Sequence, residues 1–349
     1  MLHAGKASSG FMQNVVYSSL GKKTDRLIVG PGVGADNAVI ALGGKRVMIL
    51  TVDPVSVIPP FGIELSAWLS VHLIASDYTT SGLKPEYATF SFNFPPEMPQ
   101  AAMEGYVRAV GQECERLGVV VAAGHTGSYP GAGFTVIGAG SMFGFADRGA
   151  YVETSMAREG DSILMTKFAA IEAAASLALA FPRHAEQKVG NRVASKVRQM
   201  IRLCSTVEDA MAAAGVGLGK LGVTSMHDAT EGGILGGLYE MASASGRAFA
   251  VDEKKINLSD DASAVCAAFG INPLTSLSEG TLLITCASQR VDELSRRLRR
   301  HEIPTQEIGK VREGTGLWVS RMGKKAQLAR PPKDGYWRAY DRAVSKGLS

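Results

Sequence analysis

Short apolar runs alternate with amphipathic stretches along most of this chain. Residues 47–52, Val-Met-Ile-Leu-Thr-Val, form a nearly continuous apolar run, which predicts a buried strand. Apolar residues recur at helical spacing in residues 65–73 and 101–117, which predicts helices there. Further strands are predicted at residues 119–123, 134–145 and 161–166. Strands that alternate with helices predict an α/β fold, although periodicity does not give the order of the strands.

The second half of the chain continues this alternation after a polar stretch. Residues 146–159 carry more charged side chains than the segments on either side. We therefore predict two α/β domains, residues 1–155 and residues 156–349. The helices predicted for the second domain are an alanine-rich one at 168–180, a long one at 190–213 and one that opens at Gly232.

Composition narrows the class of protein. The chain has 349 residues, 46% of them apolar, which is enough for two sizeable cores. Its net charge of +4 is too small to indicate a nucleic-acid partner, and its apolar runs are too short to cross a bilayer. The N-terminus lacks the apolar core of a signal peptide. We therefore expect a cytoplasmic protein whose widely spaced cysteines are buried, reduced thiols: Cys114, Cys204, Cys266 and Cys286.

Three aspartates stand at the ends of apolar runs, near glycine-rich turns. Asp36 lies in residues 30–40, Gly-Pro-Gly-Val-Gly-Ala-Asp-Asn-Ala-Val-Ile. Asp53 is expected at the C-terminal tip of the first predicted strand, and Asp77 follows the first predicted helix. Each alone is most simply a turn residue, but carboxylates that meet repel one another unless a cation lies between them. As a set they predict a Mg²⁺ site of the kind that binds the phosphates of a nucleotide.

A second glycine-framed site lies in residues 227–233, His-Asp-Ala-Thr-Glu-Gly-Gly. The helix that follows has one apolar face, and Asp228 or Thr230 is expected to cap it. The pair Gly232 and Gly233 then exposes backbone N–H groups at the N-terminus of the helix, which attracts anions. The alternative is a capped helix whose glycines only allow tight packing. Packing does not explain the two polar residues together with the glycine pair, so we favour contact with phosphate or with an acceptor substrate.

These motifs occur in the order found in a known group of ATP-binding proteins. The segments that match are Gly34–Ile40, Thr51–Pro54, Ser76–Asp77 with Gly82–Pro85, Gly124–Thr126, His227–Gly233, Asn272–Leu274 with Ser278–Gly280, and Ile308–Val311. In them the chain resembles the superfamily of aminoimidazole ribonucleotide synthetase (PurM-like proteins), thiamine-monophosphate kinase, selenophosphate synthetase and the hydrogenase-maturation protein HypE. It is most similar to HypE-related proteins.

The resemblance implies a two-domain PurM-like fold of the α/β (α+β) class. The N-terminal domains of a homodimer would close a barrel-like sheet, the C-terminal domain would be an α/β sandwich, and ATP would lie in a cleft at the dimer interface. By position, the implied residues are Asp36, Asp53 and Asp77 for metal; Gly34 and Asp36 for ATP; Gly124, His125 and Thr126 for a phosphate-binding turn; and Asp228, Thr230, Gly232 and Gly233 at the reacting end of ATP, with Asp228 and Thr230 catalytic.

The chain also departs from HypE. Ala35, Ser76 and Glu231 stand where HypE-type sequences commonly have an acidic residue, Asn and Arg. HypE ends in a tail whose terminal cysteine accepts the carbamoyl group, whereas this sequence has no cysteine after Cys286. We therefore expect an ATP- and Mg²⁺-dependent, HypE-related enzyme that phosphorylates an oxygen of an acceptor and does not run the HypE reaction on its own tail. The alternatives are a nucleotide-binding scaffold without turnover and a small-molecule kinase similar to thiamine-monophosphate kinase.

Four other features are given mainly structural interpretations. His72 is expected to be a core histidine, and residues 296–300 the solvated basic face of an amphipathic helix. Residues 337–344 predict a helix that docks on the protein. Lys6 could reach a phosphate if the N-terminal segment folds over ATP, although a disordered N-terminus is an equal alternative.

Overall fold

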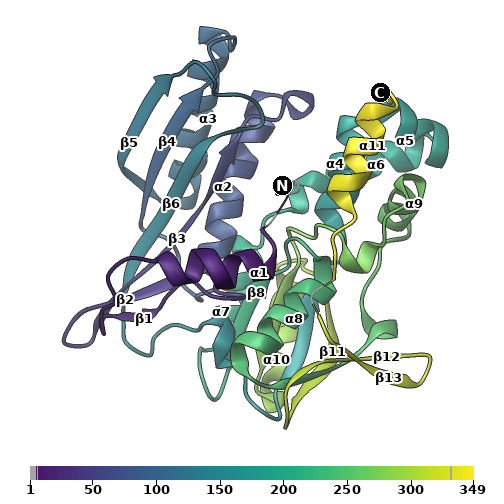
Figure 1. The fold of residues 1–349 in the computed structure, drawn as a ribbon. Coiled ribbons are helices and arrows are strands. Elements are labelled where there is room, and N and C mark those ends of the chain that lie inside the picture. Colours follow the sequence, from purple (N-terminus) through teal and green to yellow (C-terminus); the bar gives the residue numbers. More distant parts are fainter. Residues whose placement is uncertain (1–4, 6, 331) are drawn as a thin grey trace.

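The computed structural model describes residues 5, 7–330 and 332–349, so Lys6 lies outside the described residues. Two β-sheets, one from each half of the chain, each carry their own helices (Figure 1). This confirms the mixed α/β class and the two-domain organisation. The last strand of the first sheet ends at Asp147 and the first strand of the second begins at Ser162. We keep residues 1–155 and 156–349 as the proposed domains.

The first sheet has the strand order β1-β2-β3-β6-β4-β5. All neighbours in it are antiparallel except β4 and β5, which are parallel. Its strands are β1 (Leu27–Val29), β2 (Ala38–Gly43), β3 (Arg46–Ser56), β4 (Tyr87–Phe94), β5 (Val120–Ser128) and β6 (Val136–Asp147). The helices of this half are α1 (Ser9–Phe11), α2 (Ile63–Thr79) and α3 (Gln100–Leu117).

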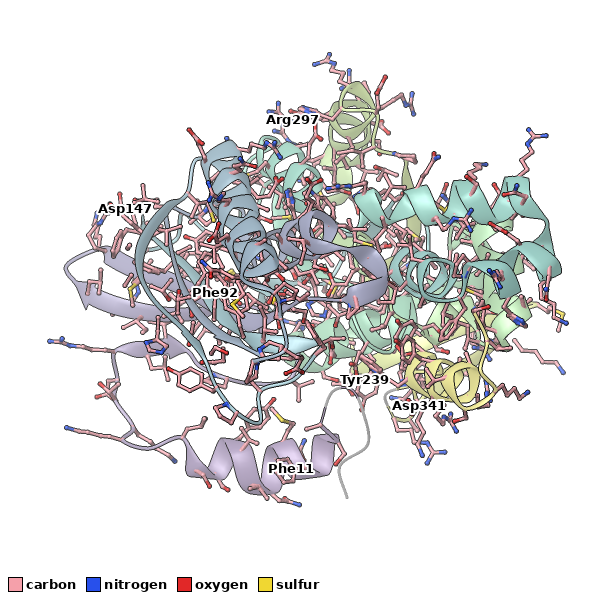
Figure 2. The ribbon with its side chains drawn as sticks, turned by 90° about the horizontal axis from the view of Figure 1, so that it is seen from above. Phe11, Phe92, Asp147, Tyr239, Arg297 and Asp341 are labelled. Atoms are coloured by element: carbon pink, nitrogen blue, oxygen red, sulfur yellow. The ribbon has the colours of Figure 1, made fainter. Side chains whose placement is uncertain are left out.

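Helices α2 and α3 pack on one face of this sheet. Alternate residues of β4 are buried against them, as expected for a strand with one covered face. Figure 2 shows one of these residues, Phe92, in the interior of this half. The opposite face is also apolar: Leu50 and Val52 of β3 lie on it, and Val52 is 62% exposed. Beside them, Tyr87 stacks on Phe143 with 5.4 Å between ring centres.

The second sheet has the strand order β13-β12-β9-β11-β7-β10-β8. Its strands are β7 (Ser162–Thr166), β8 (Val223–Asp228), β9 (Ala248–Asp252), β10 (Leu282–Cys286), β11 (Thr305–Arg312), β12 (Gly316–Arg321) and β13 (Lys324–Leu328). The helices of this half are α4 (Ile171–Ala180), α5 (Pro182–Val189), α6 (Asn191–Gln199), α7 (Val207–Ala214), α8 (Gly233–Ser245), α9 (Asp260–Phe269), α10 (Val291–Arg300) and α11 (Tyr336–Ser345).

Helices cover both faces of the second sheet, which is why its central strands are apolar throughout. Ile163 and Met165 of β7 pack with α8, whereas Leu164 between them packs with α7 and α10. The remaining helices α4, α5, α6, α9 and α11 form a separate apolar cluster (upper right in Figure 1). This places the helix predicted at residues 337–344 in a docked position.

The helix predicted at residues 190–213 is wrong as a single element. It ends at Gln199, and a short 3₁₀ turn and a non-helical link precede α7. The reason is tertiary, because other elements use the backbone groups of the link. The N–H of Thr206 donates to Oγ of Ser76 on α2 at 2.9 Å, and Nζ of Lys167 donates to the carbonyl oxygen of Ser205 at 2.8 Å.

The structure agrees with the structural interpretations of His72, the cysteines and the basic cluster at residues 296–300. His72 is a core histidine: its Nδ1 lies 2.9 Å from Oγ of Ser205, and its ring stacks on Trp68. The four cysteines are buried, free thiols. Helix α10 buries Leu294 and Leu298 and carries the basic cluster, with Arg297 at the outer edge of the molecule (Figure 2). Among the described helices, not one is both long and apolar enough to cross a membrane.

Candidate active site

The first half of the chain brings its three predicted carboxylates toward one another from three elements. Asp36 lies in the loop between β1 and β2, and Asp77 lies in the last turn of α2. Asp53 does not end its strand as predicted, because β3 pairs with β6 as far as Ser56 and Asp53 is inside it. The hydroxyl of Thr51, two residues earlier on the same strand, donates to Oδ2 of Asp77 at 3.2 Å.

Asn37 ties the loop that carries Asp36 to the end of α2. Its Nδ2 donates to the carbonyl oxygen of Asp77 at 2.7 Å and to Oγ1 of Thr80 at 2.9 Å. In the same loop, Gly34 has a φ of 71°, and a Cβ there would lie 3.0 Å from the Cβ of Glu240 on α8. Gly34 therefore allows the loop to approach the second half of the chain closely.

Strand β8 delivers His227 and Asp228 from the second half. Nδ1 of His227 lies 2.7 Å from Oδ1 of Asp36, and Nε2 lies 3.1 Å from Oε2 of Glu240. Burial alone lowers the pKa of His227, but Asp36 and then Glu240 overcome this and hold its pKa well above the usual value. A protonated imidazole therefore links the two halves, with each ring nitrogen donating to a carboxylate.

Asp228 follows His227 at the end of β8, and its side chain is buried without a hydrogen-bond partner among the described residues. The residue is only 1% exposed, and within the described part of the chain neither oxygen of its carboxylate has a hydrogen-bond partner. Burial, and then the charge of Asp36, raise the pKa of Asp228 to about 7. A buried carboxylate without a donor or cation is costly, so the two unpaired oxygens fit a bound cation.

Repulsion between carboxylates extends across the group. Burial raises the pKa of Asp77 well above its usual value, and Asp228, Asp53 and Asp36 raise it further. Ligand atoms of Asp36, His227 and Asp228 lie within 4.8 Å of one another. Because both ring nitrogens of His227 face carboxylates, the oxygens of Asp36 and Asp228 are the atoms of this group that could bind a metal ion. One or two carboxylates suit Mg²⁺, which fills its remaining positions with phosphate oxygens and water. The donor set therefore fits Mg²⁺ together with a nucleotide.

The structure adds two carboxylates that were not predicted as site residues. Burial raises the pKa of Glu279, and Asp228 then raises it further. Burial and then Asp334 raise the pKa of Glu172 to about 8. Glu279 stands in the matched segment Ser278–Gly280, which was a usable signal, whereas nothing in the sequence around Glu172 distinguishes it.

The glycine pair at the start of α8 is held differently from the prediction. Neither Asp228 nor Thr230 caps the helix; instead, the N–H of Gly232 donates to Oδ2 of Asp334 at 2.9 Å. A Cβ at Gly233 would lie 2.8 Å from the backbone nitrogen of Ser276, so tight packing does require a glycine there. The C-terminal segment also contacts this loop through Nε1 of Trp337, which donates to Oε1 of Glu231 at 3.0 Å.

Gly124, His125 and Thr126 do not form the predicted turn. They lie inside β5, the edge strand of the first sheet, and His125 is hydrogen-bonded to Tyr129 with 2.5 Å between Nε2 and the hydroxyl. Phe90 pairs with both Gly124 and Gly140, and Gly140 pairs with Asp53, so three strand spacings separate Gly124 from Asp53. That separation is about 14 Å, so one chain does not bring these residues to the aspartates.

Of the three departures from HypE, Ser76 has a structural role. It is fully buried and accepts the N–H of Thr206, as described above, whereas Ala35 is exposed in the loop beside Asp36. Glu231 places its carboxylate against Trp337 at the start of α8.

Comparison with known proteins agrees with the fold and the order of the motifs. Family models for the N-terminal and C-terminal domains of AIR synthase related protein match residues 34–146 and 158–320. The chain is 26% identical to the carbamoyl dehydratase HypE of Cupriavidus necator over 80% of this chain and 77% of that protein.

Two solved structures are similar along nearly their whole length. AaThiL, the thiamine monophosphate kinase of Aquifex aeolicus, in a complex with AMPPCP and TMP, has a TM-score of 0.70 at 20% identity, covering 95% of this chain and 98% of that one. The hydrogenase maturation protein HypE in complex with ATP has a TM-score of 0.62 at 20% identity, covering 95% and 97%. Because the two domain models together span most of the sequence, the chain belongs to the AIR synthase related family, with the two-domain PurM-like fold.

Proposed function

We propose that the protein is an ATP- and Mg²⁺-dependent enzyme that phosphorylates an oxygen of an acceptor. The observation that carries this proposal is the buried carboxylate of Asp228, whose two oxygens have no partner among the described residues and lie beside Asp36 and His227. Asp36, Asp53 and Asp77 place their charges in the same region. One or two of these four carboxylates, together with the phosphate oxygens of ATP, would hold Mg²⁺. The metal would neutralise the phosphate oxygens of ATP and the charge that develops on transfer.

The surrounding residues orient this site. His227 fixes the position of the Asp36 carboxylate from the opposite half of the chain, with Nδ1 within 2.7 and 2.9 Å of its two oxygens. Thr51 and Asn37 hold Asp77 and the end of α2. Phosphoryl transfer depends mainly on positioning and electrostatics rather than on a protein nucleophile, and a site of carboxylates, Thr230 and glycines fits that requirement. Asp228 and Thr230 are the proposed catalytic residues.

The similar proteins support ATP as the ligand. A HypE structure contains ATP, and AaThiL was solved with AMPPCP and TMP. The names of these proteins, a carbamoyl dehydratase and a thiamine monophosphate kinase, imply different acceptors, so ATP is the part that they share.

We also propose a homodimer. The first sheet has an apolar face that α2 and α3 do not cover, with Leu50, Val52, Tyr87 and Phe143 on it. A second copy of this face would complete the barrel-like sheet. The phosphate role predicted for Gly124, His125 and Thr126 requires such a second subunit, since these residues lie on the edge strand, away from the aspartates of their own chain.

One observation favours the alternative of a nucleotide-binding scaffold. Asp334 occupies the N–H of Gly232, and Glu231 adds a further carboxylate at the same helix start. Both would repel a phosphate that approached the N-terminus of α8.

Calorimetry and a product assay distinguish the two functions. Wild type should bind ATP only with Mg²⁺ and release ADP, or AMP, in a nucleotide assay run with and without candidate acceptors. Asp228→Asn should weaken Mg²⁺-dependent binding and abolish turnover, whereas Asp292→Asn on the surface of α10 should match wild type. Mg²⁺-dependent binding with no turnover for any acceptor would favour the scaffold, and no binding at all would refute both.

A further inference from the structure

Lys167 is a buried lysine directly after β7, in the second half of the chain. The residue is only 9% exposed, and its Nζ donates to three acceptors, each at 2.8 Å: the carbonyl oxygens of Ser205 and Gly280, and Oδ2 of Asp209. These three bonds use all the donors of the ammonium group. The backbone of Lys167 has a φ of 51°, in the left-handed region that a residue with a Cβ rarely adopts. The side chain is therefore held in one place by partners from three segments of the chain.

The first acceptor lies next to the segment that holds Asp77. Ser205 belongs to the link before α7, and the N–H of the next residue, Thr206, donates to Oγ of Ser76 at 2.9 Å. Ser76 directly precedes Asp77 in the last turns of α2. The lysine therefore fixes a link that in turn fixes the helix end carrying Asp77.

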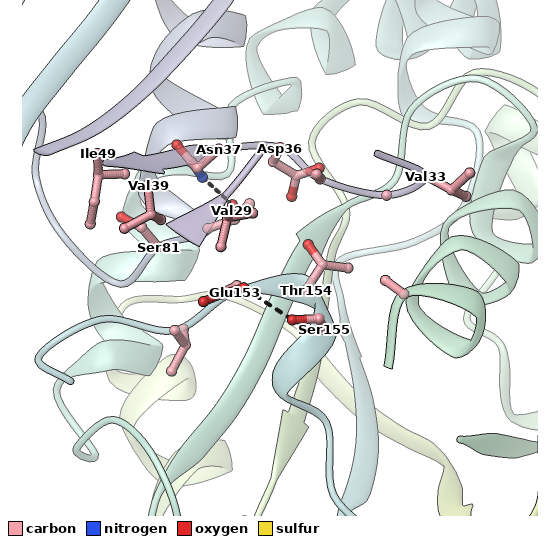
Figure 3. Close-up of a pocket in the computed structure, with 15 residues that line it drawn as sticks. Val29, Val33, Asp36, Asn37, Val39, Ile49, Ser81, Glu153, Thr154 and Ser155 are labelled. Atoms are coloured by element: carbon pink, nitrogen blue, oxygen red, sulfur yellow. Dashed lines mark hydrogen bonds between the residues drawn. The ribbon is translucent and has the colours of Figure 1, made fainter. Parts of the chain in front are cut away.

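The end of α2 borders a cavity, so its position depends on hydrogen bonds more than on packing. Thr80 and Ser81, which follow the helix, line this cavity of about 190 Å³ together with Asp36 and Asn37 (Figure 3). Nδ2 of Asn37 donates to the carbonyl oxygen of Asp77 at 2.7 Å from the side of the first sheet. The link held by the lysine supplies the corresponding bond from the second half of the chain. Without it, the helix end has open space on one side into which it can shift.

The second acceptor lies next to the segment that holds Asp228. Gly280 is in the turn before β10, and the carbonyl oxygen of the next residue, Thr281, accepts the N–H of Ala229 at 2.9 Å. Ala229 directly follows Asp228, and Asp228 itself pairs with Leu282 at the start of β10. The lysine therefore also fixes the turn that holds Asp228 in place.

The third acceptor balances the charge of the lysine. Asp209 on α7 is only 1% exposed, and either charge alone would be costly at this depth. Because the two charges form an ion pair, their fields largely cancel for groups further away. Lys167 therefore acts on Asp77 and Asp228 through the backbone segments that it joins rather than through its own charge.

We propose that Lys167 is a positioning residue for the metal and nucleotide site, an inference that rests on the proposed function. It joins the two segments that set the spacing between Asp77, from the first half of the chain, and Asp228, from the second. Mg²⁺ requires nearly octahedral coordination with metal–oxygen distances of about 2.0–2.1 Å, so a small change in this spacing weakens its binding. All three donors of the lysine are bonded elsewhere, so its effect is on the geometry of binding.

Lys167→Met tests this inference in the full-length protein. The substitution keeps the length of the side chain and removes all three hydrogen bonds. Calorimetry with Mg²⁺ and ATP should give an affinity about 10- to 100-fold lower than that of wild type, which is the usual loss when a group that orients metal ligands is removed. An affinity equal to that of wild type would overturn the inference.

A double variant separates positioning from stability. Lys167→Met alone leaves the carboxylate of Asp209 buried without its counterion, which destabilises the fold. Lys167→Met with Asp209→Leu removes both charges, so its Tm should lie above that of the single variant while its MgATP affinity stays low. The double variant also carries the test if the single variant does not fold. If MgATP affinity recovers together with the Tm, Lys167 acts on stability alone and the inference fails.

Lys310→Met is the matched control. The Nζ of this lysine also contacts three acceptors, Oγ of Ser162, Oγ of Ser288 and Oε1 of Glu307, but it does so at the opposite end of β7. Lys310→Met should bind MgATP as wild type does, and a loss as large as that of Lys167→Met would count against a specific role. If wild type binds MgATP and the Lys167 variants bind it equally well, only this inference fails. If wild type does not bind MgATP, the proposed function fails and this inference fails with it.

Discussion

The charge on Asp228 should destabilise the protein when no metal is present, and the size of this effect follows from the structure. An ordinary aspartate has a pKa of 3.8, whereas burial and Asp36 raise the pKa of Asp228 to about 7. Each pKa unit corresponds to about 1.4 kcal/mol, so ionised Asp228 costs the fold about 4 kcal/mol at pH 8. Between these two pKa values the folded protein binds more protons than the unfolded chain. Stability therefore falls as the pH rises through this window and is fully retained below it.

Asp228→Asn removes this charge and keeps the shape of the side chain. In urea denaturation with EDTA present, the free energy of unfolding of the variant relative to wild type should be higher at pH 8 than at pH 5 by about 2.5 kcal/mol. The quantity to compare is the change in this relative free energy of unfolding from pH 5 to pH 8. The unpaired amide of the variant costs about 1–3 kcal/mol at both pH values, so its cost cancels in that comparison.

Two further measurements make the test specific. Asp292→Asn, an exposed aspartate on α10, should show no such pH dependence. Saturating Mg²⁺ and ATP should stabilise wild type at pH 8 more than they stabilise Asp228→Asn, because the cation relieves the repulsion that the variant lacks. If the effect of Asp228→Asn is the same at pH 5 and pH 8, Asp228 is not a carboxylate held ionised against its surroundings, and the reasoning for a cation site there fails.

The other predictions concern single positions in the fold and the site. Asp53→Asn should weaken MgATP binding at least about tenfold in calorimetry without lowering the Tm, and an unchanged affinity would remove Asp53 from the site. Light scattering should give a dimer at micromolar concentration, and Val52→Lys on the uncovered apolar face should shift it to monomer; a wild-type monomer would contradict the shared sheet. Ser76→Ala should lower the free energy of unfolding by about 1–3 kcal/mol, because the N–H of Thr206 loses its acceptor, with Ser155→Ala as the control.

Several features could be predicted from the sequence because they depend on neighbours in the chain. The strand at 161–166 and the helices at 101–117 and after Gly232 follow from local periodicity and from glycine at a helix end. Asp36, Asp77 and Asp228 were identified because each stands in a short motif, and the structure does place them together with Asp53 around one acidic region.

Contacts between distant segments determined the features that the sequence did not predict. The break in the helix predicted at 190–213 depends on α2 and Lys167, and the end of β3 depends on pairing with β6, which no local pattern encodes. Glu172 joins the acidic group only because α4 begins beside the C-terminal segment that carries Asp334.

The sequence by itself determined which residues can form strands and helices, and which short motifs carry carboxylates and glycines, because these properties arise from steric and hydrophobic preferences within a few residues. The tertiary structure decided which of those groups meet. It placed His227 between Asp36 and Glu240, left Asp228 buried with no partner in the described chain, and kept Gly124 to Thr126 on a distant edge strand. These outcomes depend on long-range packing of the two sheets, since charge, burial and pKa are properties of a position in space rather than in the chain.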